Sequence, residues 1–177
     1  TAELARAVSV DQKTAGRYVD VLAGAFLLRR LPPWFENTGK RVVKAPKMYL
    51  RDTGLLHALL GLRTGAEIRS HPRFGASWEG FALEYVVALL RAERDAYFWA
   101  THGGAELDLL VSRGGKRYGF EFKFADVPGT TKSMRVALAD LDLERLFVVY
   151  PGERGFPLDE KIEAVPLVRL PPRLAQL

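Results

Sequence analysis

Residues 104–124 read GAELDLLVSRGGKRYGFEFKF, and this stretch decides the fold. An apolar run at 107–111, interrupted only by Asp108, predicts one short strand, and the alternation at 118–124 predicts another. The Gly-Gly pair inside 112–117 is a turn signal between the two strands. The stretch therefore predicts a β-hairpin with charged residues in both strands.

The second strand of this hairpin separates aromatic from charged side chains. Because strand side chains repeat every two residues, three phenylalanines share one face: Phe120, Phe122 and Phe124. Glu121 and Lys123 then share the other face. Asp108 adds a third charge on the partner strand, and a carboxylate inside an apolar run is costly unless it has a partner. An ordinary solvated sheet face is the alternative interpretation of this alternation.

Asp108, Glu121 and Lys123 form the set that a divalent-metal site for phosphodiester cleavage would use. Two carboxylates about 4 Å apart repel by roughly 4 kcal/mol at an effective dielectric constant of about 20, and a bound cation removes that penalty. The lysine could then orient the attacking water or neutralise the charge that develops on the phosphorane. This interpretation depends on the three side chains converging at one point.

Composition indicates a globular chain. Its 177 residues are 48% hydrophobic and 11% aromatic, enough for one core or for a small module followed by an ordinary domain. No apolar run approaches the ~20 residues needed to cross a bilayer, and no signal-peptide pattern is present, so we expect no membrane partner and a cytoplasmic location. The lack of cysteine excludes disulfides and thiolate metal sites. Because the sequence opens at Thr1 inside a helical pattern, we expect a fragment of a longer protein.

Positive charge is concentrated at the start of the chain. Residues 1–50 hold nine Lys or Arg against four Asp or Glu, a balance of +5. Residues 51–177 hold seventeen of each sign, so the whole net charge of +5 belongs to the first segment. Such a segment favours an anionic partner, of which nucleic acid is the commonest.

The basic segment predicts two helices and a hairpin. Four apolar residues give the first helix its stripe: Leu4, Ala5, Val8 and Val10. The second helix is predicted at about 11–23, with Ala15, Val19 and Leu22 buried, and a basic hairpin is predicted around 37–40. This order resembles a winged helix-turn-helix, in which the second helix enters the major groove and the hairpin wing lies along the backbone.

The winged-helix resemblance implies which side chains contact DNA. Lys13, Thr14, Arg17 and Tyr18 would lie on the reading helix, and Lys40, Arg41 and Lys44 on the wing would contact phosphates. The alternative is that this module only docks another protein or packs against the next domain. We place the module and its linking helix at 1–64, and a polar, loop-like linker at 65–74.

The second predicted domain, 75–170, opens with a helix that Ser77 can cap and that runs to about residue 91. Its apolar residues cover most of the circumference, so Glu79 and Glu84 are candidate buried or site-facing carboxylates. Five residues apart, they point about 140° from one another and cannot easily serve the same site.

The rest of this domain is predicted as a strand, the hairpin, a helix at 130–141 and an apolar strand at 146–150. A right-handed crossover of this kind returns the last strand parallel to the second strand of the hairpin. Residues 162–167 predict a final edge strand.

This order, with Asp…Glu-x-Lys in the hairpin, resembles the core of PD-(D/E)xK nuclease-like proteins. More closely, the chain is similar to the domain of unknown function 4143, which follows AAA+ ATPase modules in many bacterial and archaeal ATP-binding proteins. The segments that carry the likeness are FLLRRLPPWFENTGKRVVKAPKMYLRDTGLLHALLG (26–61), GASWEGFALE (75–84), GAELDLLV (104–111) and FEFK (120–123). The implied fold class is α/β (α+β overall), a winged helix-turn-helix followed by a restriction-endonuclease-like mixed sheet flanked by helices.

The resemblance implies Asp108 and Glu121 as ligands of Mg²⁺ or Mn²⁺, and Lys123 as the catalytic lysine. It also implies an auxiliary glutamate on the helix, for which Glu84 is preferred to Glu79 because it lies well inside the core helix. Leu107 stands where the superfamily's name has proline. No Gly-x-x-x-x-Gly-Lys-Ser/Thr loop occurs, so we expect no nucleotide site in this fragment.

Three functions follow as expectations. The first is a metal-dependent endodeoxyribonuclease joined to a winged helix, as the C-terminal part of an AAA+ protein. The second is a catalytically inactive DNA- or protein-binding module that regulates the ATPase, since many proteins with this core have lost cleavage. The third is docking of the basic segment on an acidic protein. The expected partners are DNA and the N-terminal AAA+ module of the same chain, and the chain could form an oligomer.

Overall fold

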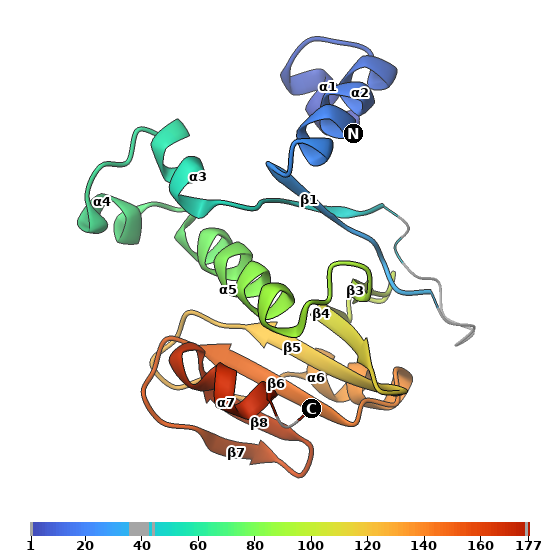
Figure 1. Cartoon of the computed structure of the whole chain (residues 1–177), viewed down its shortest axis with the longest axis vertical. Coiled ribbons are helices and arrows are strands. Elements are labelled where there is room, and N and C mark those ends of the chain that lie inside the picture. The colour runs from blue at the N-terminus through green and yellow to red at the C-terminus, as the bar shows by residue number, and fades with distance from the viewer. Residues whose placement is uncertain (1, 36–42, 44, 176) are drawn as a thin grey trace.

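The computed structural model describes residues 2–35, 43, 45–175 and 177. A mixed sheet with strand order β3-β4-β5-β6-β8-β7 forms the centre of its C-terminal part (Figure 1). The strands are β3 (Ala96–Ala100), β4 (Glu106–Arg113), β5 (Lys116–Phe122), β6 (Arg145–Tyr150), β7 (Phe156–Asp159) and β8 (Ile162–Pro166). With seven α-helices in the described residues, the chain is a mixed α/β protein, as predicted.

The predicted hairpin is formed by β4 and β5, which pair antiparallel. Gly114 and Gly115 make its turn with φ values of 58° and 75°, a conformation that favours glycine at both positions. The two strands are longer toward the turn than predicted, because residues 112 and 113 pair with 117 and 116.

The crossover after β5 places β6 parallel to it, as predicted. The connecting helix is α6 (Lys132–Asp140), which Thr131 caps by accepting a hydrogen bond from the main-chain N–H of Met134. The strand predicted at 162–167 forms as β8, but its predicted position at the edge of the sheet is wrong. β8 lies between β6 and β7, and the short strand β7 forms that edge of the sheet.

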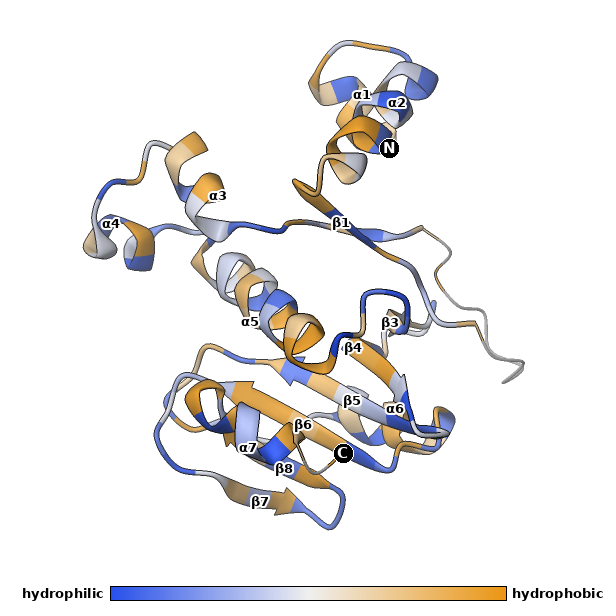
Figure 2. Ribbon diagram, in the orientation of Figure 1, coloured by the Kyte–Doolittle hydropathy of each residue, from blue (hydrophilic) through white to orange (hydrophobic). Residues whose placement is uncertain are grey.

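Two helices cover opposite faces of the sheet. α5 (Phe74–Leu90) packs on one face with side chains such as Leu109, Phe120 and Phe147, and α7 (Leu170–Leu174) joins it there. α6 packs on the other face against a second cluster, which includes Trp99. Strands that are covered on both faces consist almost entirely of apolar residues, as the hydrophobic colouring of β4 and β6 shows (Figure 2).

The N-terminal part has two helices followed by a two-stranded antiparallel sheet. α1 (Ala2–Ala7) packs on α2 (Gln12–Gly24), which Asp11 caps by accepting hydrogen bonds from two main-chain N–H groups. β1 (Leu28–Leu31) then pairs with β2 (Lys47–Leu50). This order is compatible with a winged helix, which stays a prediction, and the expected wing tip at 37–40 lies outside the described residues.

The predicted linker at 65–74 contains the helix α4 (Gly65–Ser70). It follows α3 (Thr53–Leu59), which is capped by Asp52. Thr64 and Glu67 cap α4 reciprocally, each side chain bonding the other's main-chain N–H. A loop at 65–74 was therefore the wrong prediction, and α5 begins at Phe74 rather than at a Ser77 cap.

The chain after β1 runs along the edge of the main sheet. The main-chain N–H of Trp34 donates to the carbonyl oxygen of Phe98 in β3 at 2.7 Å, and the N–H of Phe98 donates to Pro32 at 3.0 Å. The Trp34 and Tyr97 rings meet edge to face at 5.0 Å between centroids. The β1–β2 hairpin is thereby fixed against β3 and α5, which positions β2 beside the charged end of β4.

Candidate active site

Asp108 and Glu121 lie close together at the end of the paired part of β4 and β5. The pairing of these strands ends at Leu109 with Phe120, and Asp108 and Glu121 are the next residues along each strand. Oδ2 of Asp108 accepts a hydrogen bond of 3.0 Å from the main-chain N–H of Phe122. The two carboxylate residues are only 8% and 4% exposed, so they form a buried acidic pair between two apolar layers.

A β-bulge in β4 accompanies this placement. Tyr97 pairs with Leu110 and Trp99 with Leu107, so that one residue of β3 lies opposite both Asp108 and Leu109. A bulge re-aims the side chains next to it, and such irregularities recur beside active sites. This explains how a carboxylate can occur in a run of buried leucines without entering the apolar core.

Lys123 lies next to Glu121, just beyond the end of β5. Its Nζ is 3.0 Å from Oε2 of Glu121, and its main-chain N–H donates to the carbonyl oxygen of Val149 in β6. The side chain is 42% exposed, so the ammonium lies where the buried pair meets solvent. Asp108, Glu121 and Lys123 therefore converge in space.

The electrostatics of the cluster reflect burial and crowding. Burial, together with the charge of Asp108, raises the pKa of Glu121 to about 7. Burial acts to lower the pKa of Lys123, but the Glu121 carboxylate, together with Asp108 and Glu79, outweighs it and the pKa is raised. A group whose pKa is shifted by burial and a like charge together is typical of functional sites.

The helix carboxylate beside this cluster is Glu79, and the preference for Glu84 is corrected. Glu84 is held by two arginines: Arg29 binds it through Nε and, at 2.9 Å, through Nη2, and Nε of Arg51 lies 3.1 Å from Oε2. These ion pairs tie α5 to the β1–β2 hairpin. Burial and the charge of Asp108 raise the pKa of Glu79, so Glu79 belongs to the electrostatic environment of the site. The expectation that the two glutamates cannot serve one site agrees with this placement.

Three further residues, Lys47, Tyr49 and Glu106, surround the cluster and were not predicted from the sequence. Nζ of Lys47 pairs with Glu106 at the start of β4 and lies 3.9 Å from both Oδ1 of Asp108 and Oε1 of Glu79. The Tyr49 hydroxyl donates to Oε1 of Glu79 at 2.7 Å, and burial together with Glu79 raises the pKa of Tyr49. Lys47 and Tyr49 are spaced by two in β2, which places both on one face, but no local signal shows that this face meets α5.

The cluster offers oxygen ligands of the kind that Mg²⁺ and Mn²⁺ prefer. Among the described residues, no three Asp, Glu, His or Cys side chains are grouped as a ready-made metal site. The donor set nevertheless fits a divalent cation, because Asp108 and Glu121 lie close together. The pKa of Glu121 is raised mainly by burial and then by repulsion from Asp108, and a cation would relieve that repulsion. Asp108 and Glu121 could hold the ion, with Glu79 as the third carboxylate in reach of the cluster.

The predicted DNA-contacting residues are only partly described. Lys13 and Arg17 lie on α2 with exposed side chains, one helical turn apart. Thr14 is instead engaged by the cap, since its hydroxyl donates to Oδ2 of Asp11 at 2.6 Å. Lys40, Arg41 and Lys44 lie outside the described residues.

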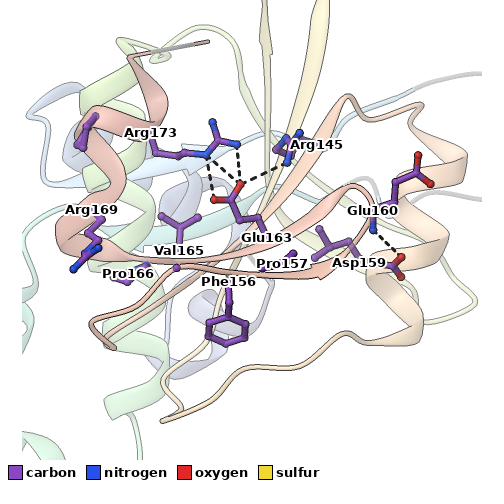
Figure 3. A pocket seen from close by; sticks show the side chains of 13 residues that line it. Arg145, Phe156, Pro157, Asp159, Glu160, Glu163, Val165, Pro166, Arg169 and Arg173 are labelled. Carbon is purple, nitrogen blue, oxygen red and sulfur yellow. Dashed lines mark hydrogen bonds and ion pairs between the residues drawn. The ribbon is translucent and has the colours of Figure 1, made fainter.

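Two pockets in the described part of the chain lie at different distances from the cluster. One of about 400 Å³ opens beside Tyr49 and Glu79, between β2, α3 and α5. Another, of about 460 Å³, lies at the β7–β8 edge, where Arg145 and Arg173 both approach Glu163 (Figure 3). The lining of this second pocket includes none of the candidate catalytic residues, whereas the lining of the first includes Glu79 but not Asp108, Glu121 or Lys123.

Comparison with known proteins gives two family matches. Residues 1–66 match a domain of unknown function, DUF8612, and residues 74–170 match another, DUF4143. Uncharacterized proteins of Mycobacterium tuberculosis and Mycobacterium bovis are each 53% identical over 165 residues, which is 93% of this chain and 37% of the relative. The chain thus spans just over a third of the length of these relatives. No solved structure matches it. No helix in the described part of the chain is long and apolar enough to span a bilayer.

Proposed function

The chain belongs to the DUF4143 family, and on that premise we propose that residues 74–170 form a metal-dependent endodeoxyribonuclease-like domain. In this proposal residues 1–66 form a winged DNA-binding module, and the whole is the C-terminal part of an AAA+ ATP-binding protein of the cytoplasm. The longer relatives, of which this chain spans 37%, leave room for such an ATPase module.

The observation that carries the proposal is the convergence of Asp108, Glu121 and Lys123. The two carboxylates are buried side by side, and the lysine ammonium stands 3.0 Å from one of them at the solvent boundary. Buried like charges are unfavourable for folding unless a cation offsets them. The Asp108–Glu121 pair, which is costly for stability and reaches solvent beside Lys123, is therefore better explained by a role in binding or catalysis.

In this proposal each residue has its own role in phosphodiester hydrolysis. A divalent cation held by Asp108 and Glu121 would supply positive charge beside the scissile phosphodiester. The Lys123 ammonium, anchored by Glu121 and reaching solvent, is placed to hold the attacking water or to stabilise negative charge on the phosphoryl oxygens. The hydrogen bond from Phe122 fixes the orientation of the Asp108 carboxylate, so that its other oxygen is presented to the site.

A nicking assay tests this proposal. Supercoiled plasmid is incubated with the chain and Mg²⁺ or Mn²⁺, and conversion to open circles is followed over time. Asp108→Asn and Lys123→Ala should each lower the rate by about a hundredfold or more, because each removes an interaction with the reacting groups. Lys116→Ala is the matched control, since Lys116 lies in the same strand as Glu121 but pairs with Glu144 instead. Undiminished nicking by both active-site variants would refute the enzymatic role.

A second candidate function is DNA binding without cleavage. It is favoured by the charge of +5 in residues 1–50 and by the exposed Lys13 and Arg17 on α2. Binding of this kind should weaken steeply with salt and should be lost in the double variant Lys13→Ala, Arg17→Ala. Salt-dependent DNA binding by a chain that never nicks DNA would select this function, and no binding at low salt would point to an acidic protein partner.

A further inference from the structure

We propose that Lys47 is a built-in counter-ion of the acidic cluster that competes with a divalent cation, so that the β1–β2 hairpin regulates metal occupancy. This inference deepens the proposed function and rests on it. Lys47 lies in the segment that matches DUF8612, whereas the carboxylates lie in the segment that matches DUF4143. The N-terminal unit thus supplies a cation to a site built by the C-terminal unit.

The position of the Lys47 ammonium carries the argument. Nζ of Lys47 forms an ion pair with Glu106 and lies 3.9 Å from both Asp108 and Glu79. It also lies over the Phe98 ring, 5.5 Å from its centroid. One ammonium therefore lies near three carboxylates from β4 and α5, and it is also stabilised by an aromatic face.

A divalent cation held by Asp108 would compete with the Lys47 ammonium for the same carboxylates. Mg²⁺ takes carboxylate oxygens at about 2.0–2.1 Å and brings two positive charges to the place where the ammonium now lies. Two cations that share the same carboxylates repel one another, so each lowers the affinity of the site for the other. The lysine side chain is long and flexible, and its ammonium can leave without breaking the pairing of β2 with β1.

The hairpin that carries Lys47 is fastened to the same helix as the site. The Tyr49 hydroxyl donates to Glu79, while Arg29 and Arg51 bind Glu84, about 1.4 turns further along α5. A shift of β2 would therefore move the counter-ion relative to the carboxylates. By linkage, an event that withdraws the hairpin favours the metal, and the metal favours withdrawal by the same factor.

Calorimetric titration of the 177-residue chain with Mn²⁺ tests the inference. Lys47→Met should bind Mn²⁺ about fivefold or more tightly than the wild type, because the competing charge is gone. Lys47→Arg, which keeps the charge, should bind Mn²⁺ no more tightly than the wild type. Lys116→Met is the matched control, in which a lysine is lost elsewhere and Mn²⁺ affinity should not change. If Lys47→Met fails to fold by circular dichroism, Lys47→Gln is measured in its place.

The outcomes separate the two proposals. Equal or weaker Mn²⁺ binding by Lys47→Met overturns the counter-ion role and leaves the metal site intact. Binding that is tightened by Lys47→Met and abolished by adding Asp108→Asn supports both. If neither the wild type nor Lys47→Met binds Mn²⁺, the metal site and the inference fall together.

Discussion

The main-chain N–H of Phe122 donates a hydrogen bond to Oδ2 of Asp108, at 3.0 Å and out of contact with solvent. This bond joins β4 to β5 next to the bulge and is made by a side chain rather than by the backbone. Asp108 therefore has a structural role in addition to the proposed metal-binding role, and variants at this position can separate the two.

Asp108→Ala should destabilise the chain by about 1–3 kcal/mol, because it leaves the buried N–H of Phe122 without an acceptor. Asp108→Asn should be close to the wild type in stability, since its amide oxygen can accept the same bond and its neutral side chain no longer repels Glu121. Urea unfolding of the three chains measures both differences. Equal stability of the Ala and Asn variants would show that the bond contributes nothing.

Stability of the metal-free chain should depend on the ionisation of Glu121. Its pKa is raised to about 7 in the folded state against the usual 4.5 of a glutamate, so between these two values the folded state holds a proton that the unfolded state has released. The folded state is therefore favoured below pH 4.5, and this advantage is lost as pH rises toward 7. Because a pKa difference of one corresponds to about 1.4 kcal/mol, the loss amounts to up to about 3 kcal/mol.

Glu121→Gln isolates this pH effect. The variant cannot ionise, so its free energy of unfolding should fall less between pH 5 and pH 7.5 than that of the wild type. Subtracting the unfolding free energies of the two chains cancels the contribution of groups that both share. Glu67 and Asp11 are such groups, and their lowered pKa values affect stability at more acid pH. Parallel pH profiles of the two chains would contradict the assignment to Glu121.

The hairpin and the crossover were predictable because their signals are local. The Gly114-Gly115 pair, the alternation through Phe120 and Phe122, and the apolar run of β6 each report a structure that neighbouring residues determine. α4 was also predictable in principle, since Thr64-x-x-Glu67 is a capping-box pattern. β7 was missed because it is a short edge strand that contains Pro157, which weakens any strand signal.

The composition of the site depended on contacts that no local pattern encodes. The triad of Asp108, Glu121 and Lys123 could be proposed from one hairpin, because strand pairing brings its members together. The choice between Glu79 and Glu84 depends on where Arg29 and Arg51 lie, more than thirty residues away in the chain. The contribution of Lys47 likewise depends on how the two units dock.

The two helix glutamates should differ in their effect on stability. Glu84→Ala should cost about 3–5 kcal/mol, because Arg29 is 9% exposed and would be left as a buried charge without this partner. Glu79→Ala should cost about 1 kcal/mol, since it mainly removes the acceptor of the Tyr49 hydroxyl. Chemical denaturation of both variants gives the comparison. A larger loss for Glu79→Ala would reverse the structural role assigned to each residue.

Gly119 should be required for the packing beneath Glu121. A Cβ atom built at this position lies 2.7 Å from Cδ1 of Leu143 and 3.3 Å from both methyl groups of Leu107, closer than side chains normally approach. Gly119→Ala should therefore destabilise the chain by about 1–3 kcal/mol, since those buried leucines have little room to move. Gly129→Ala is the control, because nothing lies within 4 Å of a Cβ atom there. Gly119 and Glu121 share one face of β5, so displacement of the strand should also lower the rate of nicking. An Ala variant with wild-type stability would mean that Leu143 can adopt another rotamer and that the face tolerates a side chain at 119.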